Sequence, residues 1–123
     1  MKRREGEQIV VKSDEEILDA IKNETPFVFH EKITHLDLFN HKFGNKGAKL
    51  ISEALKHNST ITQVMLGANQ IGLEGANAIA EALRSNSTVE CLNLWRNEVG
   101  DLGVNSIFQS LNHNQSLNKL FLS

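Results

Sequence analysis

The sequence has one cysteine, Cys91, one proline, Pro26, and no tyrosine. A single cysteine cannot form a disulfide within the chain, which favours a reducing setting. No stretch reaches the length of about 18 apolar residues that a membrane span needs, and no apolar segment of a signal peptide opens the chain. The net charge of −2, with both signs mixed along the chain, gives no overall field that would favour nucleic acid or an anionic membrane. We therefore expect a cytoplasmic, single-domain protein without a nucleic-acid or membrane partner.

One unit recurs three times through most of the chain. Two glycines of this unit recur every 28 residues, the first at Gly44, Gly72 and Gly100 and the second at Gly47, Gly75 and Gly103. Self-similarity at a fixed period of this size is typical of a solenoid, in which each unit buries its apolar face by stacking on its neighbours. The expected division of the chain is a flexible tail at 1–8, an N-terminal cap at 9–33, repeats at 34–61, 62–89 and 90–117, and a partial unit at 118–123.

Each unit changes from a strand pattern to a helix pattern. Apolar residues first alternate, as at Leu36 and Leu38, which predicts a short strand with one face in the core. They then follow helical spacing, as from Ala48 to Leu55, which predicts a helix of about three turns. A strand, a helix and a parallel strand one period later form a right-handed crossover. The fold class is therefore predicted to be α/β, a right-handed solenoid with parallel strands on the concave face and helices on the convex face.

Glycine and asparagine are predicted to shape the turns of each unit. The paired glycines permit either a close approach or a positive φ between strand and helix. Asn69 and Asn97 follow their strands, where an amide side chain can bond the backbone of the adjacent unit, and His41 stands at this place in the first unit. A second asparagine position ends each helix, where asparagine suits a left-handed residue. Its members are Asn58, Asn86 and Asn114.

The segment before the first repeat is predicted to form the cap. Residues 9–11 suit a short strand. Ser13 and Glu16 have the spacing of a capping box at the start of a short helix, which must end before Pro26. The apolar run at 27–29 is expected to cover the open end of the first repeat, because the terminal units of a solenoid must be modified to cap it.

The repeated motif identifies a family resemblance. In the second unit it is written LxLxxNxxGxxGAxxIAxAL and runs from Val64 to Leu83. This motif resembles the ribonuclease-inhibitor class of leucine-rich repeat, and the resemblance covers about residues 34–123. Similar repeats occur in ribonuclease inhibitors, in the sensing domains of NOD-like receptors and in activators of the Ran GTPase. The resemblance implies a module that binds a protein on its concave sheet face, and we expect no enzymatic activity.

The outward side chains of the predicted strands are the candidate binding residues, because no helix of the chain covers that face. Aromatic and methionine side chains grouped on one face are typical of an interface, and tryptophan in particular tends to be a hot spot. Gly67 is expected to leave a gap between Phe39 and Trp95 for a partner side chain, although Phe39 or Phe121 could instead fold back over a neighbouring unit. The predicted partner-binding residues are Asp37, Phe39, Met65, Asn93, Trp95 and Phe121.

Two other functions remain open. Leu120 and Leu122 begin a fourth strand that no helix follows in the sequence, and an uncovered apolar strand edge promotes association. The chain is therefore either a fragment of a longer solenoid or a homodimer formed through that edge. The other alternative, a regulator that activates or inhibits an enzyme such as a GTPase or a nuclease, is implied by the family resemblance alone.

No catalytic, cofactor or metal site is expected. The histidines are spread over cap, strand, turn and outer loops, so they do not suggest a tetrahedral metal site. Cys91 and His35 could suggest a nucleophile and its base, but two units separate them, roughly 10 Å at the usual strand spacing.

Overall fold

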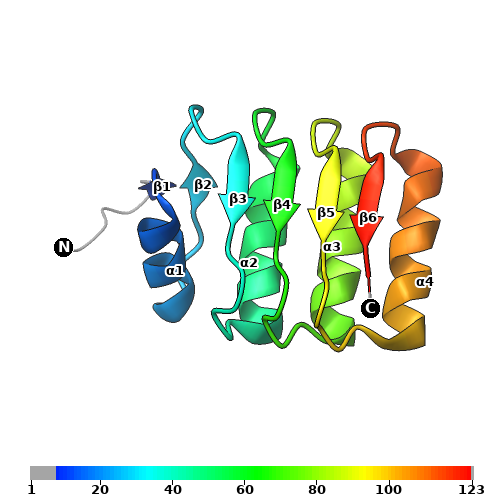
Figure 1. Cartoon of the computed structure of the whole chain (residues 1–123). Coiled ribbons are helices and arrows are strands. Elements are labelled where there is room, and N and C mark those ends of the chain that lie inside the picture. The colour runs from blue at the N-terminus through cyan, green and yellow to red at the C-terminus, as the bar shows by residue number, and fades with distance from the viewer. Residues whose placement is uncertain (1–7, 123) are drawn as a thin grey trace.

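The fold, seen in a computed structural model that describes residues 8–122, is a right-handed stack of strand–helix units (Figure 1). The predicted tail at 1–8 lies outside the described residues except for Gln8. The repeats supply one parallel sheet of order β3-β4-β5-β6, in which each residue lies opposite the residue 28 positions further on. Its strands are β3 (His35–Asp37), β4 (Gln63–Met65), β5 (Cys91–Asn93) and β6 (Lys119–Phe121).

Helices lie side by side on one face of this sheet (Figure 1). They are α2 (Gly44–Lys56), α3 (Leu73–Ser85) and α4 (Gly100–Ser110), which continues into the 3-10 turn η1 (Leu111–His113). The predicted α/β solenoid is thereby confirmed. In the part of the chain described here, no helix has both the length and the apolar character needed to cross a membrane.

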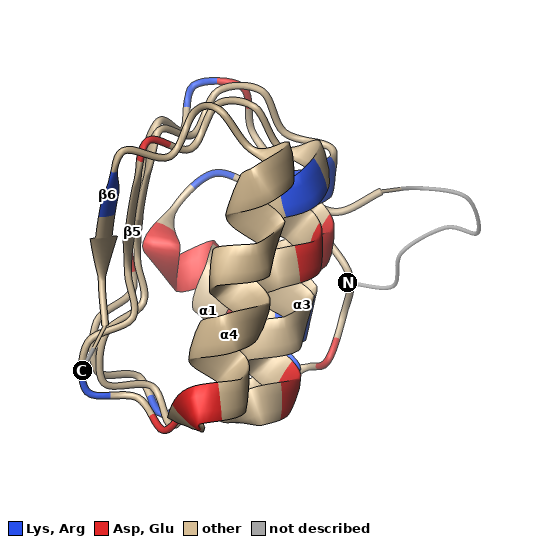
Figure 2. Ribbon diagram, turned by 90° about the vertical axis from the view of Figure 1, so that its right-hand side faces the viewer, with Lys and Arg blue, Asp and Glu red and all other residues tan. Residues whose placement is uncertain are grey.

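The core lies between the sheet and the helices (Figure 2). The middle residue of each of the first three repeat strands points into it, as does one isoleucine from each helix, and all six are buried. Each repeat therefore adds one layer to a continuous apolar core. Every Å² of apolar surface that the core removes from water stabilises the fold by about 25 cal/mol. These core residues are Leu36, Val64, Leu92, Ile51, Ile79 and Ile107.

The segment before the repeats consists of β1 (Val10–Val11), α1 (Asp14–Lys22) and β2 (Val28–Phe29). β1 pairs in parallel with β2, and the two form a sheet of their own. The rings of Phe27 and Phe29 meet edge to face at 5.4 Å and are buried in the same core as the first repeat. The apolar run thus packs against the first repeat, and the division of the chain into a cap at 9–33 stays a prediction.

A capping interaction starts α1 as predicted, with one difference. The hydroxyl of Ser13 accepts a hydrogen bond from the backbone N–H of Glu16 at 3.2 Å. The Glu16 carboxylate, however, accepts from the N–H of Lys12 at 3.1 Å, one residue before the position that a capping box uses. The helix ends at Lys22, well before Pro26.

The asparagines after the strands form a ladder between repeats, as predicted. Asn69 is fully buried, and its amide donates to the carbonyl of Leu38 in the preceding repeat at 2.6 Å. Its side-chain oxygen accepts from the N–H of His41 at 2.7 Å. Asn97 repeats the pattern one unit later by accepting from the N–H of Asn69 at 2.9 Å. Backbone groups that no helix or strand satisfies are therefore paired across the stack.

The asparagines after the helices form a second ladder, but the left-handed conformation predicted there is wrong. Asn86 has φ −91° and ψ 133°, and Asn114 has φ −128° and ψ 129°, both extended. Extended backbone lets the Asn86 amide donate to the carbonyl of Leu55 at 3.0 Å while its oxygen accepts from the N–H of Val89 at 2.9 Å. Within the repeats, the left-handed residues other than glycine lie instead in the turns after the strands, at Asn40, Lys42, Ala68, Gln70 and Arg96.

The paired glycines divide between the two predicted roles. Gly44 and Gly100 adopt positive φ values of 65° and 69° at the turn into the helix. Gly72, at the equivalent place in the second repeat, has φ −104° and so does not need glycine for that reason.

Candidate functional site

The outer face of the sheet is the surface that the helices leave uncovered (Figure 2). Because side chains alternate along a strand, the residues flanking each core leucine point to this face. Three aromatic side chains are exposed there, Phe39 and Trp95 at 44% each and Phe121 at 48%. The concave face thus presents large apolar side chains to solvent, which is unusual unless something binds them.

A hollow of about 440 Å³ lies on the N-terminal half of this face. Four of the six predicted binding residues line it, namely Asp37, Phe39, Met65 and Asn93. Trp95 and Phe121 do not line the hollow, so the predicted set divides between the hollow and the neighbouring part of the face.

The Phe39 ring occupies part of the gap predicted at Gly67, although both residues line the hollow. A Cβ atom built on Gly67 would lie 2.8 Å from a ring carbon of Phe39, so the Phe39 ring packs directly over this glycine. The ring itself takes part of the space that a partner side chain was expected to use. Gly67 therefore serves to admit Phe39 from the preceding repeat, which corresponds to the alternative of folding back over a neighbouring unit.

Trp95 has one contact at its backbone and another at its ring. The side-chain oxygen of Asn93 accepts a hydrogen bond from the backbone N–H of Trp95 at 2.8 Å. The guanidinium carbon of Arg96 lies 4.5 Å from the centre of the Trp95 ring, within the range of a cation–π contact. Such an ordered aromatic side chain loses little conformational freedom on binding, which favours it as an anchor.

Sequence reasoning missed Arg96. Adjacent residues of a strand point to opposite faces, so Arg96 was not expected beside Trp95. Arg96 instead has φ 58°, and this left-handed turn brings its side chain back over the ring. Asn40 and Ala68 at the equivalent positions are also left-handed, and of these three residue types only asparagine adopts that conformation readily, so Asn40 is the one hint in the sequence.

Charge varies along the concave face. At its N-terminal end, partial burial raises the pKa of the Asp14 carboxyl, the nearby Asp37 carboxylate raises it further, and His41 acts in the opposite direction. At the C-terminal end lie the cations Arg96 and Lys119, both exposed. The face is thus acidic near α1 and basic near β6.

The geometry does not assemble a reactive centre from the pair considered above. His35 lies on β3 and Cys91 on β5, with β4 between them, and the Cys91 side chain is buried. Within residues 8–122, no three His, Cys, Asp or Glu side chains come close enough together to hold a metal ion.

Comparison with known proteins places this architecture in a family. A family model described as Leucine Rich repeat matches residues 30–52, 57–80 and 85–108, which is more than half of the chain. The chain belongs to the leucine-rich-repeat family. No curated protein sequence matches it.

Two solved structures share the fold over 88% of the chain. The structure of leiomodin-1 actin-binding site 2 is 29% identical with a TM-score of 0.74, and the chain covers 61% of it. The C-terminal domain of tropomodulin from Caenorhabditis elegans is 15% identical with a TM-score of 0.71, and the chain covers 62% of it. The tropomodulin likeness shows the fold alone, and the chain spans less than two thirds of either structure.

Proposed function

We propose that this chain is a non-enzymatic protein-binding module whose partner docks on the concave face of the sheet. The observation that carries the proposal is Trp95, an aromatic side chain 44% exposed on an uncovered face and braced by Asn93 and Arg96. Ordered, exposed tryptophan and arginine side chains are enriched among residues that dominate binding energy. The hollow on the same face, which Asn93 also lines, offers a place for a partner side chain.

Actin is the first partner to test. The structure of leiomodin-1 actin-binding site 2 combines 29% identity with the same fold. The finer resemblance, to the ribonuclease-inhibitor class and to the repeats of NOD-like receptors, also supports concave-face binding. A regulator of a GTPase or a nuclease would be a protein-binding module of this kind whose partner is the enzyme.

Trp95→Ala is expected to weaken binding to monomeric actin by about 2 kcal/mol, roughly 30-fold in Kd, because truncating a hot-spot tryptophan costs this much. Sedimentation velocity over a range of actin concentrations measures the Kd for actin of the wild-type chain and of the variant. Trp95 is the only tryptophan of the chain, so 5-fluorotryptophan labelling gives a single fluorine resonance that reports directly on this side chain.

The matched control is Phe108→Ala, which removes an exposed aromatic side chain, 54% accessible, from α4 outside the concave face. It is expected to leave the Kd unchanged. Equal binding by wild type and Trp95→Ala would place the contact elsewhere on the molecule. Failure of the wild-type chain to bind would exclude actin as the partner.

Self-association is the second candidate, supported by the outer side of the last repeat. Phe108 is 54% exposed, whereas Ala80 and Ser52 at the equivalent positions are 5% and 1% exposed beneath the next helix. Leu120 and Leu122 are partly exposed, while their equivalents in the preceding repeats are buried. Two copies meeting at this side would cover these apolar side chains on both.

If this candidate holds, the apparent mass from light scattering should rise toward that of a dimer with concentration. The double variant Leu120→Lys plus Leu122→Lys should then stay monomeric and folded, since charges at the edge oppose strand pairing. Wild-type protein that remains monomeric at high micromolar concentration would eliminate homodimerisation through this edge.

A further inference from the structure

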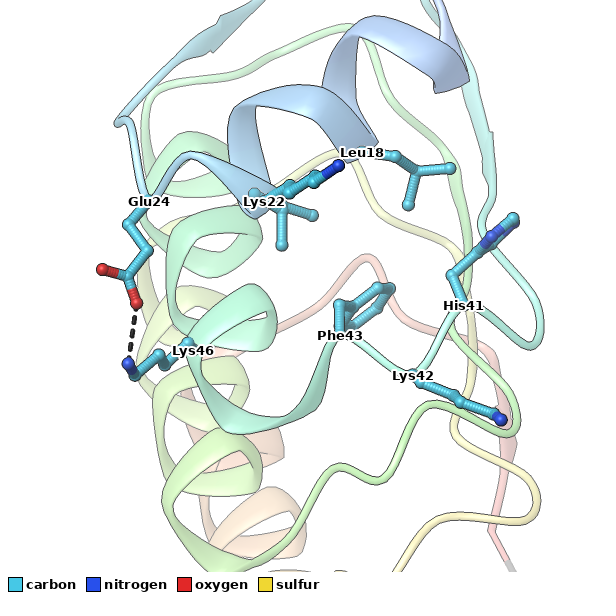
Figure 3. Close-up of a pocket in the computed structure, with 8 residues that line it drawn as sticks. Leu18, Lys22, Glu24, His41, Lys42, Phe43 and Lys46 are labelled. Carbon is cyan, nitrogen blue, oxygen red and sulfur yellow. Dashed lines mark hydrogen bonds and ion pairs between the residues drawn. The ribbon is translucent and has the colours of Figure 1, made fainter.

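A pocket of about 420 Å³ lies between α1 and the start of the first repeat, away from the concave hollow (Figure 3). Its apolar lining comes from Leu18 and Ile21 on α1 and from Phe43 just before α2. The rest of its lining carries three lysines, Lys22 and Lys46 on helices and Lys42 on the connecting turn, together with His41 and the carboxylate of Glu24. The pocket therefore combines an apolar floor with a basic rim.

The pocket arises because α1 is shorter than the repeat helices. α1 has 9 residues and α2 has 13, so α1 leaves part of the first repeat uncovered. Phe43 is consequently only partly buried, whereas Ile71 and Val99 at the equivalent positions are buried.

The other repeats serve as an internal comparison for the rim. Lys42 corresponds to Gln70 in the second repeat and to Glu98 in the third. Lys46 corresponds in the same way to Glu74 and Leu102. The repeat fold therefore does not require lysine at either position, and the first repeat differs from the others by gaining positive charge at this pocket.

We propose that this pocket binds a short acidic segment of a partner protein, with an apolar side chain on the floor and flanking carboxylates on the lysines. Lys46 already binds a carboxylate within the chain, since its ammonium donates to the Glu24 carboxylate at 2.7 Å. Within residues 8–122, no carboxylate forms an ion pair with Lys22 or Lys42.

The charge of the whole chain favours a short segment over a polyanion. The net charge is −2, and Asp14 and Asp37 lie close to His41 on the side toward the sheet. A long polyanion would extend beyond the basic rim into this acidic surface and be repelled. A peptide with a few carboxylates contacts the rim alone. The site is separate from the concave face, so this inference goes beyond the proposed function.

The test uses a fluorescein-labelled peptide with a leucine–phenylalanine core flanked by glutamates, and the same peptide with glutamines instead. By fluorescence anisotropy, the wild-type chain is expected to bind the glutamate peptide about tenfold more tightly, as two or three exposed ion pairs allow. The variant Lys42→Gln plus Lys46→Glu installs the residues of the second repeat and is expected to lose this preference. It should remain folded, because those residues occupy the same positions in the second repeat.

The matched control, Lys56→Gln plus Arg84→Glu, makes the same change in net charge on the convex helices and should keep the preference. Methyl resonances of Leu18 and Ile21 should shift on titration with the glutamate peptide. Equal affinity for the two peptides, or a preference that survives in the pocket variant, overturns the proposal.

Two further outcomes separate this site from other assignments. A single-stranded oligonucleotide that binds more tightly than the peptide, and loses binding in the pocket variant, would reassign the pocket to nucleic acid. Trp95→Ala should leave peptide binding unchanged. If this variant lost peptide binding, the peptide would bind on the concave face instead. Failure of actin binding, in contrast, concerns the concave face and leaves this prediction standing.

Discussion

Asn69→Ala is expected to lower the free energy of unfolding by about 3 to 5 kcal/mol, because four hydrogen bonds of a buried side chain are lost at once and a carbonyl that has no other donor is left unpaired. The Asn69 amide donates to the carbonyls of Leu38, Leu66 and Gly67, at 2.6, 3.1 and 3.1 Å. Its oxygen accepts from the N–H of His41. Alanine leaves the Leu38 carbonyl and the His41 N–H without these bonds, while the carbonyls of Leu66 and Gly67 keep donors in Asn97 and Asn40. Urea unfolding followed by circular dichroism measures the loss.

Two variants control for this result. Asn77→Ala removes the same side chain from an exposed position on α3 and should change the free energy of unfolding by no more than about 0.5 kcal/mol. Asn69→Asp keeps the oxygen that His41 needs but turns a buried carboxylate oxygen toward the carbonyls of Leu38, Leu66 and Gly67, so at neutral pH it should be at least as destabilising as Asn69→Ala. If Asn69→Ala costs no more than Asn77→Ala, the ladder does not stabilise the fold.

Gly75→Val is expected to cost about 3 kcal/mol, since it overpacks the contact between α2 and α3. Even a Cβ atom on Gly75 would lie 2.7 Å from Ile71 Cγ2, 2.8 Å from Asn45 Oδ1 and 3.0 Å from Ala48 Cβ. The same Asn45 oxygen accepts from the N–H groups of Gly72 and Gly75, at 2.8 and 2.9 Å. The added side chain would displace Asn45 and break both bonds. Thermal unfolding by calorimetry measures the effect.

Gly72→Ser is the matched control within the same turn. A Cβ atom on Gly72 meets its nearest neighbour at 3.5 Å, which is ordinary contact, and its backbone is extended. Gly72 is also the N-cap of α3, where serine is favoured. We expect a change within about 0.5 kcal/mol. Similar losses for both variants would show that the glycine at 75 is not selected for close helix approach.

The parts of the structure that repeat could be predicted from the sequence. Gly44, Gly72 and Gly100 set the period, and the alternation at Leu36 and Leu38 set the strand face, because each is governed by local geometry repeated at a fixed interval. The ladder made by Asn69 followed for the same reason, since a turn at every period brings equivalent backbone groups together. The division of the concave residues from the core also needed only the two-residue period of a strand.

Conformations that spacing does not encode could not be predicted in this way. Phe39 packs over Gly67 because of a side-chain rotation that no spacing encodes. Arg96 reaches Trp95 through a left-handed turn in a residue type that seldom adopts it. The asparagines that end the helices looked like left-handed caps, but Asn86 bonds the preceding repeat, and that contact needs extended backbone.

The ladder bonds also bear on how such a chain changes its length over evolution. Those that cross between repeats join residues about one period apart, 26, 28 or 31 positions, and link each repeat to its immediate neighbour, as Asn86 is linked to Asn58 and Leu55. A duplication or deletion of one whole unit therefore restores the same donors and acceptors on both sides of the junction. An insertion of any other size shifts every rung that spans it. Tandem duplication is thus the change in gene length that this architecture tolerates best, and a new binding surface can arise by copying a unit and then altering its outward residues.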